Sequence, residues 1–203
     1  HDTELDSTER LITVLERSDV QQRLLLLGEP GAGKTTELVA LAYDLLEQAE
    51  RNPFAPIPIT FELSSWKEGK SIETWLVEQL NRFYRLKKEI GQQWLEEEQI
   101  FLLLDGLDEL GLTLQRKCIS TINQFLETQT YPYTVVCCRR EEYEAGQTEL
   151  KQLKGAVYLR PLNDQQIQTY LKDLNRYSLW ENIGNNPELL DLARQPLFLT
   201  MLV

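Results

Sequence analysis

The chain has 203 residues, of which 42% are hydrophobic and 26% are charged, a composition typical of a folded globular protein. Its formal net charge of -11 at pH 7 excludes a generally basic surface of the kind that binds nucleic acids or anionic membranes, although Arg82, Arg85, Lys87 and Lys88 form a local basic patch that we expect to be solvated. The three cysteines match no zinc site and no disulfide framework, which favours the reducing cytoplasm.

A phosphate-binding loop pattern stands near the start of the chain. Residues 28–36 read GEPGAGKTT, between an apolar run of strand length at 23–27 and a helix-like stretch at 37–46. Strand, glycine-rich loop and helix is the context of a P-loop, whose backbone N–H groups form a nest for phosphates. The helix after the loop adds its positive N-terminal dipole. We predict that the whole loop binds nucleotide: Gly28, Glu29, Pro30, Gly31, Ala32, Gly33, Lys34, Thr35 and Thr36.

Two side chains of this loop have specific roles in the pattern. Lys34 supplies a positive charge for the β- and γ-phosphates, and we therefore count it among the catalytic residues. Thr35 offers its hydroxyl to Mg²⁺. Asp105 follows the apolar run 100–104, which is typical of a central strand buried on both faces. Because ligands of parallel sheets bind at the carboxyl ends of the strands, we predict that Asp105 and Thr35 hold the metal together.

Three more charged residues are predicted at the same edge of the sheet. Asp108 and Glu109 come shortly after Asp105, and hydrolysis needs a carboxylate that orients or deprotonates the attacking water. We rank Asp108 first and Glu109 second for this role, with capping of the next helix as the alternative for either acid. Arg139 ends the strand predicted at 133–138, where its guanidinium can read the γ-phosphate, unless it pairs with the acidic residues that follow it.

The remaining patterns predict an α/β fold. The predicted strands are 23–27, 57–63, 100–104, 133–138 and 156–159, with helical segments between them. Pro58 places the second strand near an edge, because proline cannot donate to a strand ladder. Alternating strands and helices imply a P-loop NTPase of the ASCE/AAA+-like type, with a parallel five-stranded sheet and helices on both faces.

The pattern divides the chain into two parts. Residues 1–160 form the predicted nucleotide-binding domain, in which 1–22 provide an N-terminal tail and a short helix near 11–15. From Pro161 onward the pattern changes to short helices, and residues 161–203 are predicted to be a small helical subdomain. Its last stretch, PLFLTMLV, ends apolar and uncapped, so we expect the subdomain to be truncated and the chain to continue in a longer protein.

Five segments together resemble a NACHT-type NTPase module of the STAND class of signalling ATPases. They are GEPGAGKTT, FLLLDGLDEL, VVCCRREEYE, LRPLNDQQIQTYL and RQPLFLTMLV, which span nearly the whole chain from Leu24. The resemblance implies that the strand ending at Arg139 lies between the P-loop strand and the strand ending at Asp105. It also implies that Arg139 is the sensor-1 arginine, although Cys137-Cys138 precede it and Arg140 follows it, where family members usually carry Thr-Ser and proline.

The resemblance further implies an adenine nucleotide, ATP or ADP, bound with Mg²⁺ at the interface of the two parts. Pro196 matches the subdomain proline that packs on the adenine in related modules. The chain would then be the ATP-binding module of a nucleotide-controlled switch with slow hydrolysis. In the full-length protein it would have protein partners and form a nucleotide-dependent homo-oligomer.

Other functions fit parts of the same pattern. An AAA+-type remodelling ATPase shares the loop and the acids, but needs an arginine supplied by a neighbouring subunit. A P-loop small-molecule kinase needs an arginine-bearing lid, whereas the residues after Arg139 are acidic. A GTPase is disfavoured because the chain has no N-K-x-D base-reading motif, and a binding-only scaffold is disfavoured by intact Lys34, Thr35 and Asp105.

Overall fold

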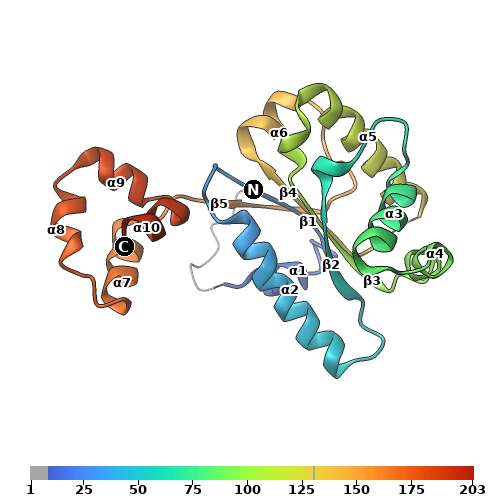
Figure 1. Ribbon diagram of the computed structural model, residues 1–203, viewed down its shortest axis with the longest axis horizontal. Helices are drawn as coiled ribbons and strands as arrows, with labels where there is room; N and C mark the ends of the chain where they lie inside the picture. Colours follow the sequence, from blue (N-terminus) through green and yellow to red (C-terminus); the bar gives the residue numbers. More distant parts are fainter. Residues whose placement is uncertain (1–8, 130) are drawn as a thin grey trace.

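The computed structural model describes residues 9–129 and 131–203, so nearly all of the predicted tail at 1–9 lies outside the described residues. Its centre is a five-stranded, all-parallel sheet in the order β2-β3-β4-β1-β5 (Figure 1). The strands are β1 Arg23–Gly28, β2 Ile57–Glu62, β3 Ile100–Asp105, β4 Thr134–Arg139 and β5 Gly155–Leu159. The predicted α/β fold with a parallel five-stranded sheet is confirmed.

The strand order agrees with the burial of the strands. Strands β3 and β4 are apolar along their length and lie inside the sheet, where both faces are covered. Strand β2 carries Pro58 and lies at the edge, as predicted. Strand β4 lies between β1 and β3, the order that the resemblance implied.

Helices cover both faces of the sheet. One face packs on α1 Leu11–Leu15 and α2 Lys34–Arg51, with Leu24, Leu26, Phe101 and Leu103 pointing toward them. The other face packs on α3 Ile72–Tyr84 and α5 Leu112–Thr128, with Leu25, Leu102, Leu104 and Val136 at the contact. The alternation of Leu24, Leu25 and Leu26 between the two faces shows the two-residue period of a strand. Figure 1 shows these two helical layers on opposite sides of the strands.

Short helices complete the sheet domain. Ser71 caps α3 by accepting a hydrogen bond from the Thr74 N–H. Helices α4 Lys88–Glu96 and α6 Arg140–Gly146 were not predicted. Short 3-10 turns follow β2 at Leu63–Ser65 and β3 at Leu107–Leu110.

Four helices after β5 pack around a small core of their own. Figure 1 shows them as a group beside the sheet. They are α7 Asp164–Asp173, α8 Leu179–Gly184, α9 Pro187–Ala193 and α10 Pro196–Leu202. Asn163 and Gln166 form a capping box at α7, and Pro187 and Pro196 stand at helix starts, where proline is tolerated. Among the described residues, no helix combines the length and the hydropathy that crossing a bilayer requires.

Candidate nucleotide-binding site

The loop between β1 and α2 adopts a conformation that depends on glycine. Gly31 and Gly33 have φ of +77° and +89°, in the left-handed region that favours glycine. A Cβ added at Gly28 would lie 3.2 Å from the Cβ atoms of both Ala32 and Leu159. The three glycines therefore keep the loop tightly folded and leave its backbone accessible, which is the cradle that a phosphate group needs.

Lys34 and Thr35 begin helix α2 directly behind this loop. The Lys34 Nζ donates hydrogen bonds to the backbone oxygens of Gly28, at 2.9 Å, and Glu29, at 3.1 Å. Its charge is thus held over the start of the loop, near the phosphate cradle. Because α2 begins at Lys34, the positive end of the helix dipole also lies beside the phosphate cradle.

Thr35 and Asp105 meet across the loop and the sheet, as the sequence predicted for a metal-binding pair. The Thr35 hydroxyl donates to Asp105 Oδ2 at 2.9 Å, while the Gly106 N–H donates to Asp105 Oδ1. These are two hard oxygen ligands, and Mg²⁺ typically takes only one or two protein ligands beside water and phosphate oxygens. The pair fits such an ion, although the described residues contain no cluster of three or more His, Cys, Asp or Glu side chains that could hold a metal alone.

Asp108 and Arg139 form a pair at the end of β4. The Asp108 Oδ1 accepts a hydrogen bond from the Arg139 backbone N–H at 3.0 Å, and Oδ2 lies 2.9 Å from Arg139 Nε. The Asp108 side chain is only 8% exposed, whereas that of Arg139 is 43% exposed. Arg139 also reaches Glu142 at 3.4 Å, as one of our alternatives anticipated.

Glu109 points in a different direction from Asp108. Its carboxyl carbon would lie 3.3 Å from a Cβ built on Gly106, so the side chain folds back toward the end of β3. Glu109 is exposed as a residue, and its carboxyl group lies near Gly106, the residue that follows Asp105. The two acids, which the sequence ranked in the order Asp108 and Glu109, therefore have distinct surroundings.

Glu62 is a further acid of this edge that the sequence analysis did not select. It ends β2 and pairs in register with Asp105 on β3. Burial, followed by the charges of Asp105 and Glu109, raises the pKa of Glu62. The rule that ligands bind at the carboxyl ends of parallel strands was a signal that could have found it.

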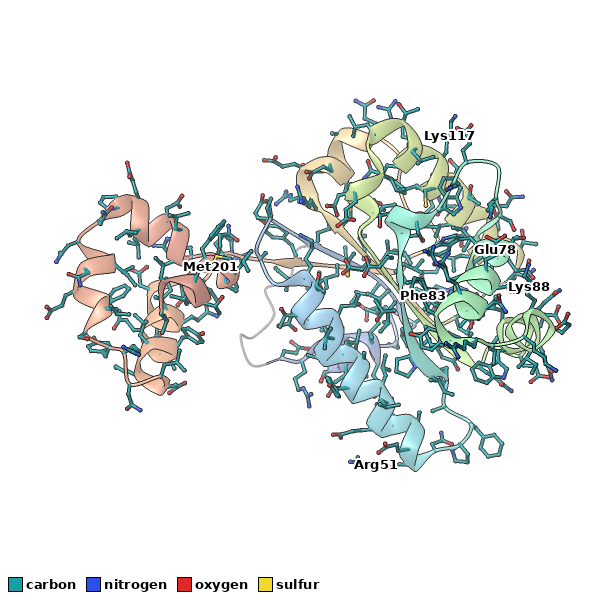
Figure 2. All side chains as sticks on the ribbon, viewed as in Figure 1. Arg51, Glu78, Phe83, Lys88, Lys117 and Met201 are labelled. Atoms are coloured by element: carbon teal, nitrogen blue, oxygen red, sulfur yellow. The ribbon has the colours of Figure 1, made fainter. Side chains whose placement is uncertain are left out.

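Helix α10 brings Pro196 against the loop. The Leu197 N–H donates to the Gly31 carbonyl at 3.3 Å, and the Pro196 Cγ lies 3.9 Å from a Cβ built on Gly33. The predicted site residues of the loop, the acids and Pro196 are thus gathered at one end of the sheet. The basic patch lies elsewhere: Figure 2 shows Lys88 at the end of the molecule opposite Met201 of α10.

A P-loop between the first strand and its helix, with Thr35 bonded to Asp105 at the end of a central parallel strand, defines a P-loop NTPase. A family model for the NACHT domain matches residues 22–177, and the chain belongs to this family. It is therefore a nucleotide-binding module. The chain is also 26% identical over 216 residues to the uncharacterized WD repeat-containing protein alr3466 of Nostoc sp. strain PCC 7120, and the match covers 90% of this chain but 14% of that protein.

Proposed function

We propose that this chain is the ATP-binding module of a STAND-class signalling ATPase, a switch controlled by ATP and ADP that hydrolyses ATP slowly with Mg²⁺. The observation that carries the proposal is the contact between the P-loop and helix α10 through Gly31 and Leu197. A loop that holds phosphates and also contacts a separate helical group can pass a change in the nucleotide to that group. We propose residues 161–203 as this second, helical subdomain, with the boundary near Arg160.

In this proposal the loop residues bind the nucleotide and the charged residues around it carry the chemistry. Backbone N–H groups of the loop and Lys34 hold the phosphates, and Thr35 and Asp105 hold Mg²⁺, which supplies charge neutralisation at the phosphates when it is bound. Pro196 packs on the adenine.

The geometry supports a division of labour between the two acids. Glu109 is exposed beside Asp105, so we assign to it the orientation of the attacking water. We assign to Asp108 the holding of Arg139, since both of its oxygens face that residue. This order reverses the ranking that the sequence alone suggested.

Arg139 would read the γ-phosphate by exchanging one partner and keeping another. Its guanidinium would leave Asp108 Oδ2 for a phosphate oxygen, while its backbone N–H keeps the bond to Oδ1. A half-exposed guanidinium can make this exchange at low cost because water already solvates it. A triphosphate would then be distinguished from a diphosphate by the position of one side chain.

The wider role is also a proposal. The relative in Nostoc carries WD repeats by its name, and repeat domains of that kind serve as interaction surfaces, which supports protein partners for a longer protein that contains this module. A nucleotide-dependent homo-oligomer is the form that we expect for the switch. A cytoplasmic location is supported by Cys118, Cys137 and Cys138, which are free and buried among the described residues.

Substitution of Lys34 by alanine tests the nucleotide site. ATP at one hundred times its Kd should stabilise the wild-type protein by about 2.7 kcal/mol, and Lys34→Ala should abolish that stabilisation. The measurement is thermal unfolding with and without ATP and Mg²⁺, and Lys151→Ala, an exposed lysine outside the site, is the matched control. An ATP-dependent shift that survives Lys34→Ala would remove Lys34 from the site.

A further inference from the structure

Three side chains form a connected contact beside the P-loop that the proposed function does not use. The Tyr158 hydroxyl donates a hydrogen bond to Glu29 Oε1 at 3.0 Å, and the Arg140 guanidinium carbon lies 4.9 Å from the centre of the Tyr158 ring. Arg140 is held in place by Glu144, at 2.7 Å. We refer to Arg140, Tyr158 and Glu29 as the strap.

The strap crosses the carboxyl end of strand β1. In the sheet β1 lies between β4 and β5, and Tyr158 of β5 pairs in register with Leu27 of β1. Arg140 follows the last residue of β4, so its contact with Tyr158 spans the point where β1 ends and the loop begins. Glu29, the second residue of the loop, is therefore connected to both strands that flank β1. It bonds directly to Tyr158 of β5, and Tyr158 in turn contacts Arg140 at the end of β4.

Glu29 presents an electrostatic problem for a phosphate site. Its carboxylate belongs to the loop whose backbone is to hold a polyanion, and like charges at short range repel each other. Its backbone oxygen already accepts from Lys34 Nζ at 3.1 Å, so a carboxylate that turned inward would compete for the charge that the phosphates need. The hydrogen bond from Tyr158 holds this carboxylate toward β5 instead.

The protonation of Tyr158 suits this role. Burial, and then the hydrogen bond and the charge of Glu29, raise the pKa of Tyr158, while Arg140 acts in the opposite direction. The hydroxyl therefore keeps its proton and remains a donor at neutral pH. Arg140 lies over the ring and helps to hold it in place beside the loop.

We propose that Tyr158, supported by Arg140, is a positioning residue for nucleotide binding, which keeps the Glu29 carboxylate away from the phosphate cradle. The inference rests on the proposed function, because it concerns the affinity of the same loop for phosphates. It explains why an acidic residue can stand inside a phosphate-binding loop. It also assigns a role to Arg140, the residue that follows the proposed sensor arginine, because Arg140 supports the Tyr158 ring.

Substitutions of Tyr158 and Glu29 test the proposal by comparing nucleotides that carry three, two or one phosphates. Tyr158→Phe removes the hydroxyl and keeps the ring beneath Arg140, so the fold should survive, which thermal unfolding without nucleotide will verify. The Kd of ATP, measured by titration calorimetry with Mg²⁺, should rise about tenfold, the loss expected for one hydrogen bond to a charged group. The rise should be smaller for ADP and smallest for AMP. Glu29→Gln should bind ATP at least as tightly as the wild type, and adding Tyr158→Phe to it should change the Kd less than twofold.

The outcomes separate this inference from the proposed function. If Tyr158→Phe leaves the Kd of ATP unchanged in a protein whose ATP binding depends on Lys34, the inference is overturned alone. If Tyr158→Phe weakens ATP, ADP and AMP equally, and does so in the Glu29→Gln background too, its role is structural and the inference is also overturned. If the wild-type chain shows no ATP binding that depends on Lys34, the proposed function fails and the inference fails with it.

Discussion

The different surroundings of Asp108 and Glu109 make the most demanding prediction for the catalytic site. Both oxygens of Asp108 face Arg139, one toward its backbone N–H and one toward its guanidinium. Glu109 is exposed and folds back over Gly106, toward Asp105. Substituting the two acids one at a time should therefore separate an effect on stability from an effect on turnover.

The expected size of the stability effect follows from the two contacts of Asp108. A hydrogen bond to a charged group contributes about 1.5–3 kcal/mol when buried, but the arginine side chain is 43% exposed, which reduces the pair to about 1 kcal/mol. Asp108→Asn keeps an oxygen for the Arg139 N–H and should cost about 1 kcal/mol. Asp108→Ala also leaves that N–H unpaired, for a total of about 2–4 kcal/mol.

Glu109→Gln should behave in the opposite way. Because its side chain is exposed, the free energy of unfolding should change by less than about 0.5 kcal/mol. If Glu109 orients the attacking water, as we propose, loss of its carboxylate should lower kcat by about a hundredfold or more, with the Kd of ATP unchanged. Asp108→Asn should lower kcat less than Glu109→Gln does.

Urea unfolding and phosphate release at saturating ATP and Mg²⁺ measure the two effects on the same preparations. An Asp108→Asn variant that loses turnover without losing stability, together with a Glu109→Gln variant of normal turnover, would contradict these roles of the two acids. That result would return the water-facing role to Asp108, the first choice from the sequence. If phosphate release by the wild type is too slow to detect, stability and ATP affinity become the deciding measurements. In that case, an Asp108→Ala variant as stable as the wild type would contradict the role assigned to Asp108.

Three other outcomes are expected. Thr35→Ala and Asp105→Asn should each remove the Mg²⁺ dependence of ATP affinity, measured by calorimetry with and without the ion; an unchanged dependence would exclude this pair as the metal site. ATP should raise the unfolding temperature more than GTP, and Pro196→Ala should narrow the difference; equal shifts in the wild type would contradict an adenine contact at Pro196. Burial raises the pKa of Cys118 and Cys138 from 9.0 to about 12, so thiol reagents at pH 8 should modify them only after unfolding. Because these thiols lose their protons at lower pH in the unfolded chain than in the folded one, the free energy of unfolding should fall as the pH rises from 9 toward 12. Rapid modification of the native protein would show that these thiols are not buried.

The sheet could be predicted from the sequence because its strands carry strong signals. The apolar runs of β1, β3 and β4 mark strands buried on both faces, and Pro58 marks an edge. Helices α4 and α6 carry weak signals. The first has an apolar side that includes Trp94 and Leu95, but it is only nine residues long and is interrupted by Gly91 and two glutamines; the second is a short acidic segment without an apolar stripe.

The assignment of the acids could not be made from spacing. The sequence places Asp108, Glu109 and Arg139 at one edge of the sheet, but their directions depend on the turn after β3. Gly106 has φ +75° there and starts a short 3-10 helix, so that Asp108 turns toward β4 while Glu109 returns over Gly106. Asp108 and Glu109 are adjacent in sequence, but the backbone geometry of this turn in the folded chain gives them different partners.

The coupling that we propose between the loop and α10 relies on a general feature of helix ends and needs no special side chain. Pro196 stands at the start of α10 and has no N–H, so the Leu197 N–H is the first donor of the helix that needs a partner. In most helices an N-cap side chain accepts from such a donor, but in the described structure Gln195 makes no side-chain cap hydrogen bond, and the Gly31 carbonyl of the P-loop accepts instead. The P-loop therefore supplies the acceptor that a capping side chain of α10 would otherwise provide. In the proposed function, a rearrangement of Gly31 around a phosphate would alter this contact with the helix that also carries Pro196, and would couple the nucleotide to the C-terminal helices through one backbone hydrogen bond.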